Sequence, residues 1–125
     1  MWETLLFVYM VNTMLLIIHE MDAAYWKEWK LFNLGGGIDC FLVIHFPLML
    51  IVLYGLVLVS RHEHGGLLYS LLVCAAGIFA FGVHYHFNGQ GKPGFTSVVS
   101  RVVLIGTVVV SFAQAVITLL VYFGA

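Results

Sequence analysis

Charged residues are scarce in this chain. Of its 125 residues only five are Lys or Arg and six are Asp or Glu, which makes 9% charged, whereas soluble domains carry roughly 25%. The net charge is near zero and no basic run occurs, so we expect neither nucleic acid nor an anionic lipid anchor as a partner. Water is therefore not the main solvent of this protein.

Disulfides and a cleaved leader are also not expected. The two cysteines, Cys40 and Cys74, lie in different apolar segments and form no Cys-x-x-Cys pair. Their expected depths differ by more than a disulfide can bridge. The first segment lacks a basic leader, carries Glu3 and ends in His19-Glu20 instead of small residues. We therefore predict two inert thiols and a retained first helix.

Apolar residues dominate instead, at 62% of the chain. Several successive segments approach or exceed the roughly 18 residues that cross a hydrocarbon layer as a helix. This pattern predicts an all-α fold, a four-transmembrane-helix bundle that forms a single integral-membrane domain over 1–125, with the lipid bilayer around it. The helices are expected at about 3–19, 38–60, 67–86 and 98–123.

The segment 20–34, before three consecutive glycines, mixes aromatic and charged residues. Its aromatic rings alternate with acidic groups and lysines, which suits the headgroup region. We therefore expect an interfacial amphipathic segment that either prolongs helix one or lies along the membrane surface. In this interpretation Trp26 and Trp29 are anchors and Glu28 is an interfacial charge.

Four crossings place both termini and the turn 61–66 on one side of the membrane. The other side then holds four basic residues against a lone Arg61, and the positive-inside rule makes that side cytoplasmic. Both termini would face outward, and a bacterial inner membrane is the expected location. The four basic residues are Lys27, Lys30, Lys92 and Arg101.

The same topology gathers seven ionisable residues on the cytoplasmic side. Such groups cost a few kcal/mol at membrane depth and normally face the bundle interior, where they find partners. We therefore expect them to be partners for one another. They are His19, Glu20, Asp22, Asp39, His45, His84 and His86.

Helical spacing narrows this set. His19 and Asp22 are three residues apart and share a face with Asn12. His84 shares a face with Ala80 and Gly77, small residues that permit close helix contact, so it should look inward. In the last helix, polar residues recur at spacings of four, three and four, and that stripe should face protein: Thr107, Ser111, Gln114 and Thr118.

His45 is the most informative of these residues. It lies roughly 10 Å along the second helix from Ile38, at about 1.5 Å per residue, and Pro47 removes a backbone hydrogen bond close to it. The imidazole is too deep to reach the interface easily. It therefore needs partners in the bundle, either directly or through a shared metal ion.

Imidazole with carboxylate suits a divalent zinc, iron or manganese ion, and helix bundles build such sites from inward side chains. No compact motif such as His-Glu-x-x-His is present. Two alternatives to a metal site explain the same residues. The first is that the polar groups are solvated helix ends and His45 is a hydrogen-bonded core residue. The second is a haem with His45 and His84 as axial ligands. The expected metal ligands are His19, Asp22, His45 and His84, with Glu20 and His86 as reserves.

The string from His19 to Trp29 resembles small, uncharacterised bacterial four-helix membrane proteins with a His-Glu-x-Asp motif and a following Glu-Trp pair. It is also loosely similar to the His-x-x-Glu-Glu family of four-helix membrane proteins, whose His and acidic residues are thought to bind metal. This chain has Asp22-Ala23 where that family has two glutamates. The resemblance implies a metal site and no particular reaction.

Three classes of function remain open from the sequence. The first is a metal-binding membrane protein, with an enzyme acting on a membrane-soluble substrate as one form of it. The second is an accessory subunit, in a homo-oligomer or a larger membrane complex. The third is transport, for which a bundle of four helices would need to oligomerise.

Overall fold

The computed structural model describes residues 1–89 and 97–124, and this part of the chain is almost entirely helical. Four of its helices, α1, α3, α4 and α5, are long and apolar enough to cross a membrane. The predicted all-α, four-helix architecture is therefore confirmed. The elements are α1 (Trp2–Tyr25), α2 (Glu28–Leu31), α3 (Gly37–Ser60), α4 (Gly65–Gly89) and α5 (Val98–Tyr122).

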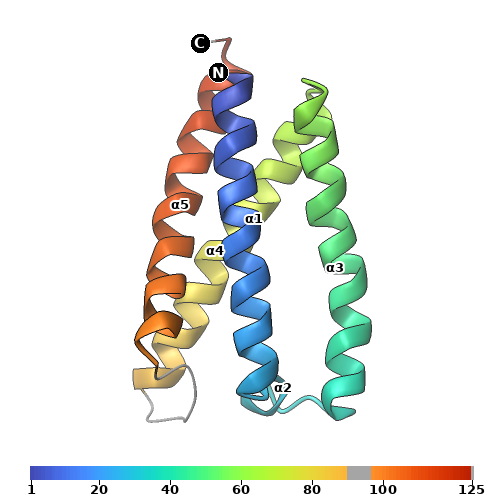
Figure 1. The fold of residues 1–125 in the computed structure, drawn as a ribbon, viewed down its shortest axis with the longest axis vertical. Helices are drawn as coiled ribbons and strands as arrows, with labels where there is room; N and C mark the ends of the chain where they lie inside the picture. The colour runs from blue at the N-terminus through green and yellow to red at the C-terminus, as the bar shows by residue number, and fades with distance from the viewer. Residues whose placement is uncertain (90–96, 125) are drawn as a thin grey trace.

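Both termini lie at one end of the bundle and α2 lies at the other (Figure 1). α1 is central and contacts each of the other four helices. α4 crosses the bundle obliquely: it begins against α3, where Gly66 meets Val59, and farther along it packs on α5. As a result α3 and α4 diverge toward the end that carries α2 (Figure 1).

The segment 20–34 divides into a helix end, a turn and a short helix. α1 continues six residues beyond His19, because two alanines favour helix and Ala23 is fully buried in the bundle. Lys27 then adopts a left-handed backbone (φ 56°, ψ 56°) that redirects the chain into α2. The first part of this segment therefore prolongs helix one, which was one of the two expected arrangements.

Gly36, like Asn33, is a left-handed residue that precedes α3. Its φ is 89°, and an added Cβ would lie 2.6 Å from the Cβ of Cys40, so the turn requires glycine there. α3 then runs without interruption through Pro47 to Ser60. Cys40 and Cys74 are free thiols, as predicted.

A network of polar side chains connects α1, α4 and α5 in the middle of the bundle. The predicted stripe on α5 is buried, which confirms that it faces protein. Asn12 donates to the Gln114 Oε1 at 2.9 Å and to the Ser111 Oγ at 3.1 Å. Gln114 in turn donates to the Ser70 Oγ at 2.8 Å, and Ser70 and Thr118 share a 2.7 Å hydrogen bond. These bonds hold three helices in one register.

α3 is attached differently. The Tyr9 hydroxyl donates to the carbonyl oxygen of Val52 at 2.7 Å, and Gly55 leaves room for the rings of Tyr9 and Tyr69. This contact lies in an apolar cluster near the end of the bundle that carries the termini. This contact therefore holds α3 near that end.

Close contact between α4 and α5 depends on Gly77. A Cβ at this position would collide with the Ser111 Oγ and lie 2.9 Å from the Thr107 Cγ2. We expect Gly77→Ala to lower the thermal stability of the detergent-solubilised protein, with a free-energy cost of about 1–3 kcal/mol from overpacking. Gly82→Ala is the matched control, because a Cβ there meets nothing within 4 Å. Equal melting temperatures for the two variants would contradict this account of the contact.

Candidate metal centre

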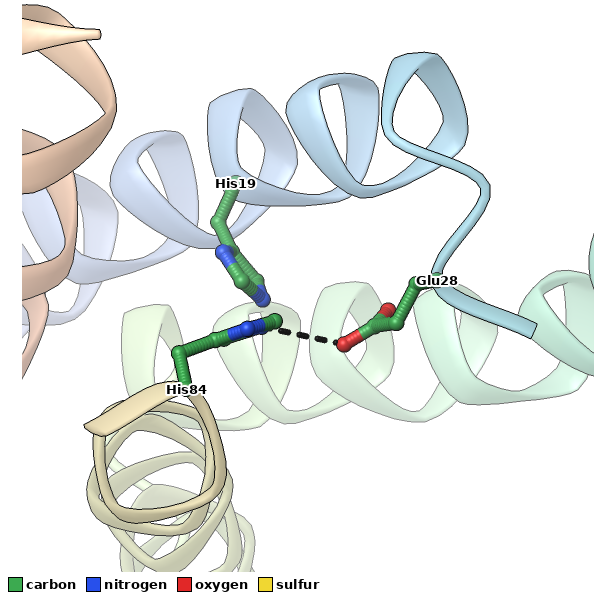
Figure 2. Close-up of side chains that lie close together, drawn as sticks. All are labelled: His19, Glu28 and His84. Atoms are coloured by element: carbon green, nitrogen blue, oxygen red, sulfur yellow. Dashed lines mark ion pairs between the residues drawn. The ribbon is translucent and has the colours of Figure 1, made fainter. Parts of the chain in front are cut away.

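Three side chains from three helices meet near the α2 end of the bundle. They are His19 on α1, Glu28 on α2 and His84 on α4, and one ligand atom of each lies within 4.8 Å of the other two. The histidines are 2% and 1% exposed, and the side chain of Glu28 is 13% exposed. Figure 2 shows both imidazoles and the carboxylate directed toward one another.

The side chains of this triad, His19, Glu28 and His84, lie close together. The His84 Nε2 lies 3.1 Å from the Glu28 Oε1, and the rings of His19 and His84 meet edge to face with centroids 5.0 Å apart. The left-handed turn at Lys27 carries Glu28 back over the bundle. His84 points inward, as its shared face with Gly77 predicted.

A second pair lies beside the triad, between Glu20 on α1 and His45 on α3. The His45 Nδ1 lies 2.7 Å from the Phe41 carbonyl oxygen, so this nitrogen carries a hydrogen and donates it. The His45 Nε2 lies 2.6 Å from the Glu20 Oε2, the separation of an ion pair when the imidazole is protonated. In that state the two side chains together have no net charge.

Glu20 connects the pair to the triad, since its Oε1 lies 4.0 Å from the His19 Nε2. The five residues together form one group drawn from four helices, called here the His/Glu cluster: His19, Glu20, Glu28, His45 and His84. Two imidazole nitrogens and a carboxylate oxygen within mutual reach form a donor set that suits zinc, iron or manganese. The cluster can also hold and pass protons.

Two of the expected ligands, His19 and His84, lie in the triad, and His45 joins through Glu20. Asp22 is half-buried on α1, one turn beyond His19, and its carboxylate is outside the group of three. His86 is exposed, with its ring 5.6 Å from that of Phe87. Asp39 is also exposed, near the start of α3.

Glu28 is the residue whose role in the cluster sequence reasoning missed. Its aromatic and basic neighbours favoured an interfacial charge, and its place in the triad depends on the turn at Lys27. That turn has no glycine or asparagine to signal a left-handed backbone. The only signal was a third carboxylate in the segment after His19, following Glu20 and Asp22.

The fold and the cluster define a small four-helix protein with the features of an integral membrane protein and a buried His/Glu cluster. By its match to a family model over residues 5–121, the chain belongs to the family of unknown function DUF6713. No curated protein and no solved structure matches the chain. The match gives no support to the resemblance with His-Glu-x-Asp proteins or with the His-x-x-Glu-Glu family.

The 2.6 Å contact predicts coupling between Glu20 and His45. His45→Ala removes the partner of a largely buried carboxyl group, which should cost about 1–3 kcal/mol of stability. Glu20→Gln in the same chain should recover part of that cost, because an amide needs no charge partner. Thermal unfolding of the two single variants and the double variant in detergent measures this coupling, expected at about 0.5–3 kcal/mol. Strictly additive effects would show that the two side chains do not interact.

Proposed function

We propose that this protein binds a divalent metal ion inside the membrane, between His19, Glu28 and His84. The observation that carries the proposal is the convergence of two buried imidazoles and a carboxylate from three helices. Ionisable groups at this depth are costly unless they are paired or bind an ion. A metal ion would offset that cost for all three side chains at once.

Glu20, His45 and Asp22 take indirect roles in this proposal. Glu20 lies 4.0 Å from the His19 Nε2, beyond hydrogen-bond distance, and can act on that ring through its charge. Asp22, one turn along α1, is the candidate for orienting His19, as carboxylates near metal-bound histidines commonly do. His45 acts through Glu20.

A metal ion with three protein ligands can be catalytic as well as structural. Catalytic zinc sites combine three side chains with a water molecule in the fourth position, where the metal acts as a Lewis acid. Zinc, iron and manganese all fit imidazole with carboxylate. The function that follows is a metal-dependent enzyme acting on a membrane-soluble substrate.

Other functions have less support from the geometry. A haem with His45 and His84 as axial ligands conflicts with the His45 Nε2, which is engaged by Glu20 at 2.6 Å. Among the described residues, no contact specifically favours a transport path. An accessory subunit in a homo-oligomer or a larger membrane complex would fit the apolar outer faces, which lipid satisfies equally well.

The metal proposal predicts stoichiometric zinc, iron or manganese in protein purified from membranes in mild detergent, measured by elemental analysis. His19→Ala, His84→Ala and Glu28→Ala should each lower the metal affinity by more than about 100-fold. Loss of a residue that only orients a ligand typically costs up to about 100-fold. Asp22→Asn should cost no more than about 10–100-fold.

His86→Ala is the matched control, since His86 lies two residues from His84 on the same helix and is exposed. It should retain the metal. Absence of metal after loading, or equal metal content in the His84→Ala and His86→Ala proteins, would overturn the proposal.

We further propose that the end of the bundle with the His/Glu cluster faces the cytoplasm of a bacterium. Lys27, Lys30 and Arg101 belong to that end, as the positive-inside rule requires, whereas Arg61 belongs to the other. Lys92, the fourth basic residue of the prediction, lies outside the described residues.

A tag on the C-terminus tests this orientation. External protease should remove the tag from intact spheroplasts, because both termini are then outside the inner membrane. A tag that is cleaved only after the membrane is permeabilised would reverse the orientation.

A further inference from the structure

Two neighbouring cavities lie beside the His/Glu cluster, between α3 and α4. The first, of about 250 Å³, contains the side chains of His19, Glu20, Glu28 and His45. The second, of about 280 Å³, is apolar apart from Glu20 and His45. Both volumes approach the lower end of the range for ligand sites, about 300–1,000 Å³. The two cavities share Leu16, Glu20, His45, Leu48 and Ala76, so together they form one groove, called here the α3–α4 groove.

This groove is bordered by side chains that face lipid. Ile44 and Leu48 on α3 and Phe79 on α4 line it and are exposed large apolar residues. All three belong to helices long enough to cross a membrane, and the two helices diverge at this end of the bundle (Figure 1). An exposed apolar border at membrane depth meets acyl chains. A ligand would therefore enter from the bilayer.

The groove is polar in one half and apolar in the other. At its centre the His45 Nδ1 donates to the Phe41 carbonyl oxygen and the His45 Nε2 faces the Glu20 carboxylate, so the Glu20–His45 pair can accept a hydrogen bond from a ligand. The second cavity offers only hydrocarbon beyond that pair, from Met49, Ile51, Val52, Leu72 and Val73. A groove of this kind fits a molecule with a small polar head and a long apolar tail.

Charge restricts the head of that molecule. No Lys or Arg occurs among the described residues that line the two cavities, and the carboxylates of Glu20 and Glu28 disfavour an anionic head. Both carboxylates already face a histidine, Glu20 at 2.6 Å from the His45 Nε2 and Glu28 at 3.1 Å from the His84 Nε2, so a cationic head would have to compete with these contacts. An uncharged oxygenated head satisfies both conditions.

We propose that the α3–α4 groove binds a single-chain lipid with an uncharged hydroxyl head. The head hydrogen-bonds to the Glu20–His45 pair, next to the metal triad, and the tail lies between α3 and α4. A lipid of this kind would be the substrate of the proposed metal site, and this part of the proposal rests on the proposed function. Lipid binding itself needs only the groove and the Glu20–His45 pair.

Trp29 offers a local reporter for the test. It lines the polar half of the groove, and its ring lies 5.6 Å from that of Phe41, which in turn lies 4.0 Å from the ring of His45. Bromine quenches tryptophan fluorescence only at short range. The probe is a dodecanol with bromine beside the hydroxyl-bearing carbon, titrated into phosphatidylcholine nanodiscs that contain the full chain.

We expect saturable quenching with this alcohol and little with its isomer that carries bromine at the far end of the tail. Trp29→Phe should abolish the saturable part. Ala76→Phe, at the junction of the two cavities, should raise the half-saturating mole fraction by on the order of tenfold or more. Ala75→Phe is the matched control, since Ala75 is the preceding residue on α4, equally exposed, and lines neither cavity.

The head is tested with three analogues of the probe: the carboxylate, the trimethylammonium and the plain alkane. The alcohol should saturate at the lowest mole fraction, and the alkane should not saturate. Tighter binding of the carboxylate or the ammonium would overturn the assignment of the head. Absence of saturable quenching by any analogue in the unsubstituted protein would overturn the site.

Chelator-treated protein separates this inference from the metal proposal. The alcohol should still quench saturably without metal, because its partners are Glu20 and His45. Saturation that appears only in metal-loaded protein would contradict that role of the pair. A chain that binds the alcohol but never binds metal would keep the lipid site and remove the metal site.

Discussion

An ionisable side chain within a bilayer has no water to complete its hydrogen bonds, so other protein groups must do so. In this protein such side chains face one another in the His/Glu cluster. Glu20 lies between the His45 Nε2 and the His19 Nε2, and Glu28 lies against His84. Because these residues come from α1, α2, α3 and α4, the cluster ties the α2 end of the bundle together. It also explains why the chain folds back at Lys27, which brings the second carboxylate to the histidines.

The two sides of the bundle are held by different interactions. The network from Asn12 through Gln114 to Ser70 joins α1, α5 and α4 at mid-depth. α3 is attached by the Tyr9 hydroxyl near the termini and by the Glu20–His45 pair near α2. Between these two attachments α3 leaves the α3–α4 groove open toward lipid. The polar network therefore lies on one side of the bundle, and the groove beside the His/Glu cluster lies on the other.

Sequence reasoning could predict the helices and the inward residues, because length, hydropathy and helical spacing act locally. His84 above Gly77, and the polar stripe through Gln114, follow from positions three or four apart. The partners of these residues could not be predicted in the same way. Asp22 shares a face with His19 yet lies outside the triad, whereas Glu28 reaches it through a left-handed turn at a lysine. Pairing across helices depends on crossing angles and turns that one sequence does not specify.

The central claim, that the triad binds metal, is tested most directly by X-ray absorption spectroscopy of the zinc-loaded protein. The account predicts a zinc ion with two imidazole nitrogens and carboxylate or water oxygens at about 2.0–2.2 Å. His84→Ala should reduce the imidazole contribution to a single ring. A shell of oxygen atoms without imidazole, or a sulfur at about 2.3 Å from the nearby Cys40, would contradict it.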